Sequence, residues 1–351
     1  MSWSVNVYNC DQGREVMSGC VRLAIVGAGL KAVEYAQSWL RMSGISIVAV
    51  ADTSAAARDR FADLCREAGE TSPDLFEDVH SLLASCRDRI DAVYLSTPHA
   101  FHAEGALAVI DAGLDLLLEK PMVTTQGEAQ SLISACSKTN ATVVIAYQGG
   151  LSPLVSDLGS RASRGEFGEL ISISGNIWEN WSKQYGGQWK QVPEISGGGF
   201  MFDTGAHMMN TVCTLANNDF ARVSAFMNNR GKAVDIVTAV AARLSNGALV
   251  TLNAVGDTPS RCESHITLYF TEATIRVDAW GQWREIVRPD GSVDRKEEEI
   301  VDNPLLTFLA IRDGKMPNLS PVENGMRLAK LWDAIKASAA EDGVPVSISA
   351  S

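Results

Sequence analysis

The chain has 351 residues, of which 46% are hydrophobic and 21% charged, and its formal net charge is −12. This length accommodates two domains with separate cores. The negative charge disfavours nucleic acids and anionic membranes as partners, because both carry charge of the same sign. The seven cysteines and five histidines form no disulfide framework or metal-binding motif that spacing reveals, so we expect no metal and a reducing, cytoplasmic location.

Two further features of the sequence bear on whether the chain enters a membrane or is secreted. No apolar run is long enough to span a bilayer. Residues 1–20 contain charged side chains and lack the apolar core of a secretory signal, so we interpret them as an N-terminal extension. A small molecule is therefore the expected partner.

Short apolar runs alternate with amphipathic stretches from residue 21 to residue 147. Strands buried on both faces are predicted at Val21–Val26, Ile45–Ala51, Ala92–Leu95, 114–118 and 142–147. Helices are predicted between them, at residues 31–42, 55–68, 79–86, 102–112 and 126–137. This alternation is typical of an α/β domain with a parallel sheet and right-handed crossovers.

The pattern changes near residue 148. After a helix at Pro153–Ser163, strands that alternate in polarity are predicted at Leu170–Trp178, 222–228, 234–244, 248–255 and 266–270. Asn246 and Gly247 predict a hairpin turn. Helices are predicted at residues 203–215 and 322–340. Residues 148–351 are thus expected to form an α+β domain with a large open, mostly antiparallel sheet.

A glycine-rich turn follows the first strand. Gly27, Gly29 and Ala32 match the pattern G-x-G-x-x-G/A, and Leu30 and Lys31 open the helix behind it. The first glycine allows the turn, and the second lets the backbone approach a pyrophosphate. The N–H groups of the helix N-terminus attract the phosphates. The turn predicts a Rossmann dinucleotide-binding domain over residues 21–147.

The second strand ends at Asp52, at the spacing expected for the acid that binds the adenosine ribose. A carboxylate there accepts hydrogen bonds from both ribose hydroxyls and repels a 2′-phosphate. This favours NAD over NADP. Arg58 lies nearby in the sequence and keeps NADP as an alternative.

Three more motifs occur in a fixed order. They are Thr-Pro-His-Ala-Phe-His at residues 97–102, Glu-Lys-Pro at 119–121, and a glycine run leading to Asp and His at 196–207. With the glycine turn, they make the chain resemble the glucose-fructose oxidoreductase / inositol dehydrogenase (Gfo/Idh/MocA) family from residue 21 to the last helix. The resemblance implies an NAD(P)-dependent enzyme that moves a hydride between nicotinamide and a secondary alcohol or ketone carbon of a sugar, sugar derivative or cyclitol.

This chemistry needs a base for the alcohol proton and a cation for the developing alkoxide. His207 is the candidate base, since the pKa of histidine lies near working pH. Asp203 lies four residues earlier, so on one helix the two would share a face. Asp203 would then orient His207, raise its basicity or bind a substrate hydroxyl. The resemblance implies that Lys120 contacts substrate and nicotinamide and that the Lys120–Pro121 bond is cis.

The remaining candidates surround these groups. We expect cofactor contacts from residues after the third, fourth and fifth strands: Thr97, Pro98, His102, Glu119, Lys120, Pro121 and Gln148. His102 either contacts the cofactor or only begins the next helix, and Glu119 either closes the cofactor pocket or forms a salt bridge. Gly149 and Gly150 indicate a roomier pocket, a substrate without a carboxylate or phosphate at that spot, or only a looser interdomain hinge.

Substrate contacts are expected from Lys120, Asp203 and His207 and from aromatic residues before the glycine run. Trp181 and Trp189 offer faces that pack against the C–H groups of a sugar ring, and Lys190 reaches a hydroxyl; tryptophans also occur in cores. Asn210 stands where the resemblance leads us to expect a second acid, which leaves the oxidised carbon open.

Two other functions remain compatible with the sequence. Some members of the family that the chain resembles are NAD-dependent glycosidases, which act by transient oxidation and elimination. A non-catalytic NAD-binding regulator is the other alternative, although it has no need of Lys120, Asp203 and His207. We also expect a homodimer or homotetramer, formed through the exposed face of the second sheet.

Overall fold

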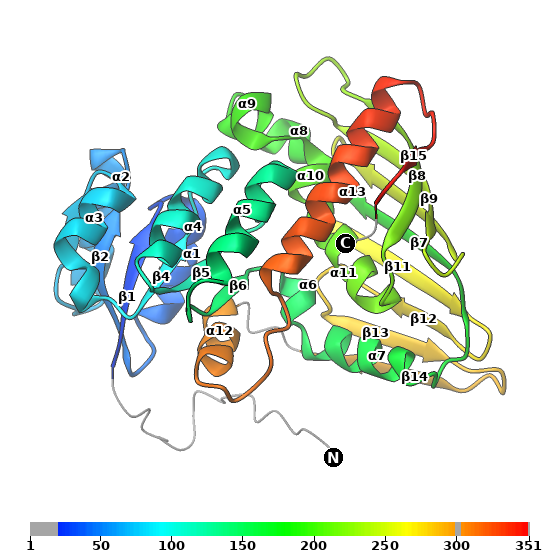
Figure 1. The fold of residues 1–351 in the computed structure, drawn as a ribbon, viewed down its shortest axis with the longest axis horizontal. Coiled ribbons are helices and arrows are strands. Elements are labelled where there is room, and N and C mark those ends of the chain that lie inside the picture. Colours follow the sequence, from blue (N-terminus) through cyan, green and yellow to red (C-terminus); the bar gives the residue numbers. More distant parts are fainter. Residues whose placement is uncertain (1–19, 299–302, 350–351) are drawn as a thin grey trace.

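The computed structural model describes residues 20–298 and 303–349, which form two domains built around separate sheets (Figure 1). The first sheet is parallel and contains, in spatial order, β3 (Asp74–Phe76), β2 (Ile45–Ala51), β1 (Val21–Val26), β4 (Ala92–Leu95), β5 (Asp115–Leu118) and β6 (Val143–Ile145). This is the Rossmann strand order. In such sheets ligands bind at the topological switch point, where the strand order reverses, which here lies between β1 and β4. The short edge strand β3 is the only one of the six that the sequence did not predict.

Helices cover both faces of this sheet. They are α1 (Leu30–Trp39), α2 (Ala55–Glu67), α3 (Val79–Cys86), α4 (His102–Asp111) and α5 (Gln126–Cys136). Side-chain caps explain several starts: Ser54 caps α2, and Asp78 and Thr125 form capping boxes at α3 and α5. Each helix begins within one residue of its predicted start. Apolar residues of the strands are buried on both faces, as the continuous runs predicted.

The second sheet is much larger. In spatial order it contains β14 (Val293–Glu297), β13 (Trp283–Val287), β12 (Thr274–Val277), β11 (Glu263–Phe270), β7 (Leu170–Trp178), β10 (Leu249–Val255), β9 (Val237–Leu244), β8 (Phe220–Asn228) and β15 (Val346–Ser347). Only the pair β7 and β10 is parallel among these strands. The predicted mostly antiparallel sheet is confirmed, and Gly247 adopts a φ of 93° in the predicted β9–β10 turn.

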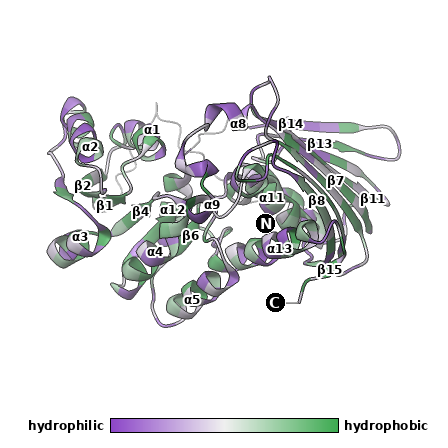
Figure 2. Ribbon diagram, turned by 90° about the horizontal axis from the view of Figure 1, so that it is seen from above, coloured by the Kyte–Doolittle hydropathy of each residue, from purple (hydrophilic) through white to green (hydrophobic). Residues whose placement is uncertain are grey.

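One face of the second sheet carries helices and the other does not (Figure 2). The covering helices are α6 (Gln148–Leu151), α7 (Pro153–Ser163), α11 (Gly205–Ala216) and α13 (Val322–Ala340). The short helices α8 (Trp181–Gln184), α9 (Pro193–Ser196) and α10 (Phe200–Asp203) lie between the two domains. In the described residues, no helix combines the length and apolarity needed to cross a membrane.

Helix α12 (Pro304–Arg312) was not predicted, and it packs on the first domain rather than the second. Asn303, which precedes it, accepts a hydrogen bond of 2.8 Å from the indole N–H of Trp39. At its other end, Arg312 pairs with Asp115 at 2.7 Å. The first core is therefore completed by a segment from far along the chain.

Two more contacts tie the domains together. The carbonyl of Ser320 accepts a hydrogen bond of 2.9 Å from Ile145 N in the edge strand β6. Helix α13 then packs against α5 of the first domain as well as β8 of the second. These contacts fix the two walls of the space between the domains.

Candidate active site

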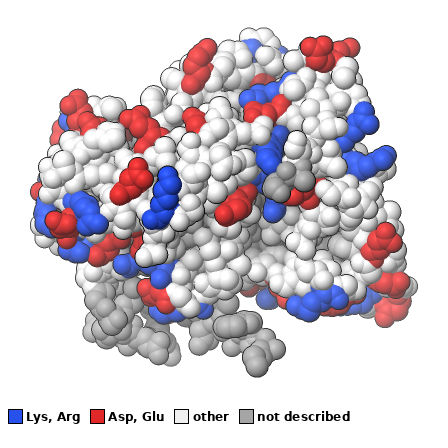
Figure 3. Space-filling model, in the orientation of Figure 1, with Lys and Arg blue, Asp and Glu red and all other residues white. Residues whose placement is uncertain are grey.

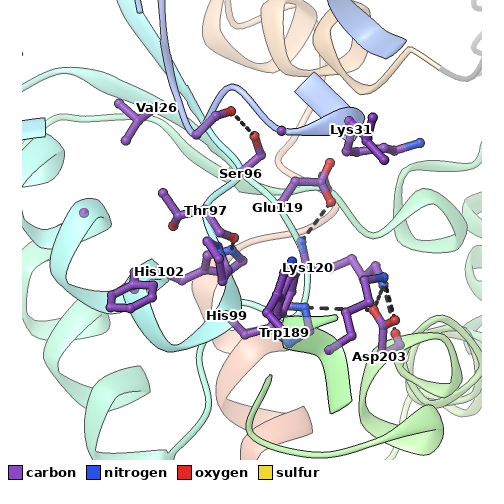
Figure 4. A pocket seen from close by; sticks show the side chains of 18 of the residues that line it. Val26, Lys31, Ser96, Thr97, His99, His102, Glu119, Lys120, Trp189 and Asp203 are labelled. Carbon is purple, nitrogen blue, oxygen red and sulfur yellow. Dashed lines mark hydrogen bonds and ion pairs between the residues drawn. The ribbon is translucent and has the colours of Figure 1, made fainter. Parts of the chain in front are cut away.

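A cleft of about 1090 Å³ lies between the domains and is lined by residues of both (Figure 4). Most of the predicted site residues line it: Gly27, Gly29, Leu30, Lys31, Asp52, Thr97, Pro98, His102, Glu119, Lys120, Gln148, Trp189, Lys190, Asp203 and His207. Three predicted residues do not line it: Ala32, Pro121 and Trp181. The four motifs therefore converge on one space, although they lie far apart in sequence.

The glycine turn has the geometry that a dinucleotide requires. Gly27 has a φ of 90°, and a Cβ there would lie 2.7 Å from the backbone of Ser96 and Thr97, so only glycine fits. Gly29 precedes α1 without a side-chain cap, and no atom would lie within 4 Å of a Cβ there. The first-turn N–H groups of α1 are thus open to a pyrophosphate, and the residues present fit NAD(P).

Asp52 stands at the end of β2 and borders the same cleft. Its carboxylate accepts hydrogen bonds of 2.8 Å from Ala28 N and from Ser54 N, which fix its direction. Arg58 donates to the main-chain oxygen of Asp52 and is not among the residues that line the cleft. The acid, rather than the arginine, is therefore presented to the space where an adenosine ribose would lie.

Asp203 is the centre of a buried charged cluster. Lys120 Nζ donates to its Oδ1 at 3.0 Å and to its main-chain oxygen at 2.9 Å. Lys190 Nζ and the indole N–H of Trp181 both donate to Oδ2, at 2.7 and 2.8 Å. Burial opposes ionisation, but the two ammonium groups hold the pKa of Asp203 well below its ordinary value. Lys120 is thereby aimed from the tip of β5 toward the second domain.

His207 lies on α11 and faces the cleft with 8% of its surface exposed. Its Nδ1 is buried and has no hydrogen-bond partner in the described structure. Burial and the Lys120 ammonium lower the pKa of His207 well below its ordinary value, so the ring is neutral. A neutral imidazole that lines the cleft can accept a proton from a ligand.

The predicted pairing of Asp203 with His207 is not observed. The single helix expected over residues 203–215 is interrupted at Thr204, which separates α10 from α11. No hydrogen bond joins the two side chains in the described structure, because both carboxylate oxygens of Asp203 accept from other groups. Asp203 orients Lys120 and Lys190 instead of His207.

Trp181 also departs from its predicted role. Its side chain is fully buried, and its N–H is bonded to Asp203. The expectation that it stacks on a sugar ring is wrong, because its ring belongs to the core that supports the carboxylate. Trp189 lines the cleft and remains available for such a contact.

Glu119 and the Lys120–Pro121 segment hold the cofactor side of the cleft. Glu119 accepts a hydrogen bond of 2.8 Å from the buried hydroxyl of Tyr94, and burial raises its pKa. The Lys120–Pro121 peptide bond is cis, as the resemblance implied. Both ring nitrogens of His102 lie against main-chain oxygens, at 2.8 Å from Pro121 and 2.7 Å from Thr97. His102 thus joins two loops of the cleft and has no free nitrogen for a cofactor.

Several residues of the cleft escaped prediction, among them His99, Glu179, Cys262 and Trp280. The Nδ1 of His99 lies 2.8 Å from the main-chain oxygen of Ser196, so the ring ties the first domain to the second. Burial lowers the pKa of His99 to about 3. His99 stood inside a recognised motif and Glu179 directly after a predicted strand, which were usable signals. Cys262 and Trp280 come from loops that carry no such signal.

Comparisons with known proteins agree with this geometry. The family described as "Oxidoreductase family, NAD-binding Rossmann fold" matches residues 21–147, and the GFO/IDH/MocA C-terminal domain matches residues 157–276. D-xylose 1-dehydrogenase (NADP(+)) of Haloarcula marismortui is 27% identical over 269 residues, which are 74% of this chain and 72% of that protein. An alpha-N-acetylgalactosaminidase of Bacteroides fragilis is 27% identical over 156 residues, or 44% of this chain and 37% of that protein.

A solved structure shares the fold over nearly the whole chain. Levoglucosan dehydrogenase, in complex with NADH and levoglucosan, aligns with a TM-score of 0.79 over 94% of this chain and 99% of that one, at 20% identity. Both domains thus have counterparts in a single known architecture. Since the matched residues include the glycine turn, the Glu-Lys-Pro motif and the histidine helix, the chain belongs to the Gfo/Idh/MocA family of NAD-binding oxidoreductases.

Proposed function

We propose that this protein is an NAD(P)-dependent dehydrogenase or reductase for a secondary alcohol or ketone carbon of a sugar, sugar derivative or cyclitol. One observation carries the proposal. Lys120 from the first domain and His207 from the second line the same cleft as the glycine turn and Asp52. A cation, a neutral imidazole and a dinucleotide site are the parts that alcohol oxidation needs.

Each side chain has a separate task. His207 accepts the proton of the reacting hydroxyl in the direction of oxidation, since its ring is neutral and lines the cleft. Lys120 stabilises the negative charge that develops on that oxygen, and Asp203 holds the ammonium in place. The nicotinamide, when bound, supplies or accepts the hydride.

Substitution of Lys120 and His207 tests this assignment. Lys120→Ala and His207→Ala should each lower kcat by about 100-fold or more. The affinity for NADH, measured by its fluorescence, should change little, because neither side chain belongs to the glycine turn. Lys183→Ala and His265→Ala, at exposed positions, are matched controls. Wild-type turnover in both site variants would refute the assignment.

We further propose NAD as the preferred cofactor. The support is that Asp52 lines the cleft, whereas Arg58 is bonded to the main chain. A carboxylate that faces the adenosine ribose repels a 2′-phosphate. The xylose dehydrogenase relative is named for NADP(+), so the proposal of NAD rests on the residues of this chain and not on that relative.

A redox glycosidase is the second candidate, because an alpha-N-acetylgalactosaminidase is among the relatives. Such an enzyme retains NAD and produces no net NADH. A panel of sugars, cyclitols and nitrophenyl glycosides separates the two functions. A rise in NADH absorbance indicates a dehydrogenase, whereas release of nitrophenol without NADH indicates a glycosidase.

A further inference from the structure

Glu179 lies in the wall of the cleft, and no step of the proposed chemistry uses it. It directly follows β7, and its backbone is fixed at both ends. Its N–H donates to Val255 at 3.1 Å, and its carbonyl accepts from Thr258 at 3.3 Å. The residue is 9% exposed, so its side chain is held in one place and points into a confined space.

The Glu179 carboxylate has no cationic partner among the residues that the structure describes. Its hydrogen bonds come from neutral donors, the hydroxyl of Thr204 at 3.0 Å to Oε2 and the thiol of Cys262. Burial and the nearby Asp203 raise its pKa. Asp203, by contrast, is paired with two ammonium groups. Since a buried carboxylate is costly unless it is paired or hydrogen-bonded, this one is suited to a donor that enters the cleft.

Thr204 places this carboxylate beside the catalytic cluster. Thr204 follows Asp203 in the chain, so Glu179 is one residue and one hydrogen bond away from the groups that hold Lys120. Tyr185 and Cys262 line the same part of the cleft, and burial with the nearby carboxylates raises the pKa of the Tyr185 hydroxyl to about 12. The phenol stays protonated, which leaves Glu179 as the anionic hydrogen-bond acceptor next to it.

The formal charges at this end of the cleft cancel. Lys120 and Lys190 carry two positive charges, and Asp203 and Glu179 carry two negative charges. A neutral ring therefore enters without leaving a net charge buried. A sugar acid or sugar phosphate would add a negative charge where both lysines are already bonded to Asp203.

We propose that Glu179 is a specificity-determining residue, whose carboxylate accepts a hydrogen bond from a hydroxyl on a ring carbon other than the one oxidised. The ligand class is a neutral polyhydroxylated ring. The inference rests on the proposed function, because it concerns the substrate of the same cleft. It adds a second point of attachment, which sets the ring's orientation over Lys120 and His207.

The test pairs a variant with altered substrates. Wild type and Glu179→Gln are assayed with D-glucose, D-xylose, levoglucosan and myo-inositol, and then with each monodeoxy analogue of the best substrate. We expect Glu179→Gln to lower kcat/KM for the best substrate by about 10- to 100-fold, mainly through KM. The same substitution should have little effect on the one analogue that lacks the recognised hydroxyl. Glu179→Asp should recover part of the loss, because it keeps the charge.

Controls separate recognition from folding. The affinity for NADH should be unchanged in Glu179→Gln, and Glu194→Gln, at an exposed position on α9, should behave as wild type. Equal losses for every analogue would overturn the inference and leave the proposed function standing. D-glucosamine is assayed beside these sugars, and a loss confined to it would overturn the inference by assigning the carboxylate to an ammonium group. A wild-type protein that oxidises none of the sugars would overturn both.

Discussion

Burial sets the charge of each group in the cleft. His207 and Asp203 are both almost fully buried, yet the pKa of each lies well below its ordinary value for different reasons. Desolvation lowers that of His207, whereas the lysines overcome desolvation at Asp203. The result is a neutral imidazole at His207 beside an ionised carboxylate at Asp203. His207 is therefore the group that can accept a proton, whereas Asp203 stays paired with the two lysines.

The lowered pKa of His207 has a predictable effect on activity. A base of ordinary pKa, about 6.5, would lose function as pH falls through that value. Because His207 stays neutral at lower pH, the acid limb of kcat for sugar oxidation should lie below about pH 6.5. A pH profile with saturating substrate measures this. An acid limb at or above the ordinary value would contradict the proposed base.

The same shift affects stability. Below about pH 6.5 the unfolded chain binds a proton at His207 that the folded protein does not. Unfolding is therefore favoured as pH falls, and this contribution disappears above that range. Denaturant titrations of wild type and His207→Gln between pH 5 and pH 8 should show a smaller pH dependence in the variant.

Asp52 predicts the choice of cofactor. Asp52→Ala should weaken NAD binding and remove the repulsion of a 2′-phosphate, so the ratio of kcat/KM for NAD over NADP should fall by about 10-fold or more. Asp59→Ala, on the same helix as Arg58, is the control. An unchanged ratio would show that another group sets the preference.

At the scale of elements, a buried carboxylate positions the glycine run ahead of α10. Asp235 accepts hydrogen bonds from Gly199 N at 2.6 Å and Met201 N at 3.0 Å. A Cβ on Gly199 would lie 1.9 Å from the carbonyl of Asp235, so the approach requires glycine. This clamp fixes the start of α10 and thereby the position of Asp203 one turn later.

Loss of this clamp should cost stability. Asp235→Asn removes one of the charge-assisted acceptors, and we expect the free energy of unfolding to fall by about 1–3 kcal/mol, with a larger loss for Asp235→Ala. Chemical denaturation measures the change. Asp257→Asn, which breaks a surface ion pair with Arg230, should cost about 1 kcal/mol or less. If the two Asn variants lowered the free energy of unfolding equally, the hydrogen bonds of Asp235 would stabilise the fold no more than a surface ion pair does.

The elements that sequence patterns predicted well are those whose neighbours are local. Continuous apolar runs located five strands of the first sheet, and alternation located β7 to β11. The short strands β12, β13 and β14 were missed, because each is only four or five residues long and partly polar. Helix α12 was missed although a proline begins it and its residues are mostly apolar, since its partner surface lies in the other domain.

In the active site, too, residues whose positions depend on local sequence were predicted better than those that depend on distant contacts. Motifs located Lys120, Asp203 and His207, because backbone requirements place those residues near glycine and proline. Spacing alone failed for the Asp203–His207 pair, since nothing local indicated that lysines from elsewhere in the chain would bind the Asp203 carboxylate. It also failed for Trp181, because whether an indole faces a ligand or a core depends on distant contacts.

At the scale of the whole molecule, the uncovered face of the second sheet is uncharged at its centre. Register places Thr267, Ser174, Thr251, Ala241 and Ser224 in one row across β11, β7, β10, β9 and β8. Short side chains of this kind leave a flat surface suited to a second sheet. On the face seen in Figure 3, acidic and basic residues are interspersed, without a broad patch of one sign.

A homo-oligomer formed through this row is the expected state. Thr251→Arg would place a charge at its centre and should shift the sedimentation coefficient toward that of a monomer. Ser131→Arg, on an exposed helical position of the first domain, should leave it unchanged. Sedimentation velocity of both variants measures the difference. A wild-type protein that is monomeric at micromolar concentration would contradict the expectation.

Helix α12 gives the chain an unusual dependence on its own later portion. Trp39 donates to Asn303, and apolar residues of α12 belong to the same buried cluster, so this core is incomplete until residues 303–312 have been synthesised. Most of the second domain is therefore synthesised before the nucleotide-binding domain can finish folding. A fragment of residues 21–147 would expose the apolar surface that α12 covers, so we expect it to aggregate. A fragment in which residues 303–312 are fused to the C-terminus of residues 21–147 should aggregate less.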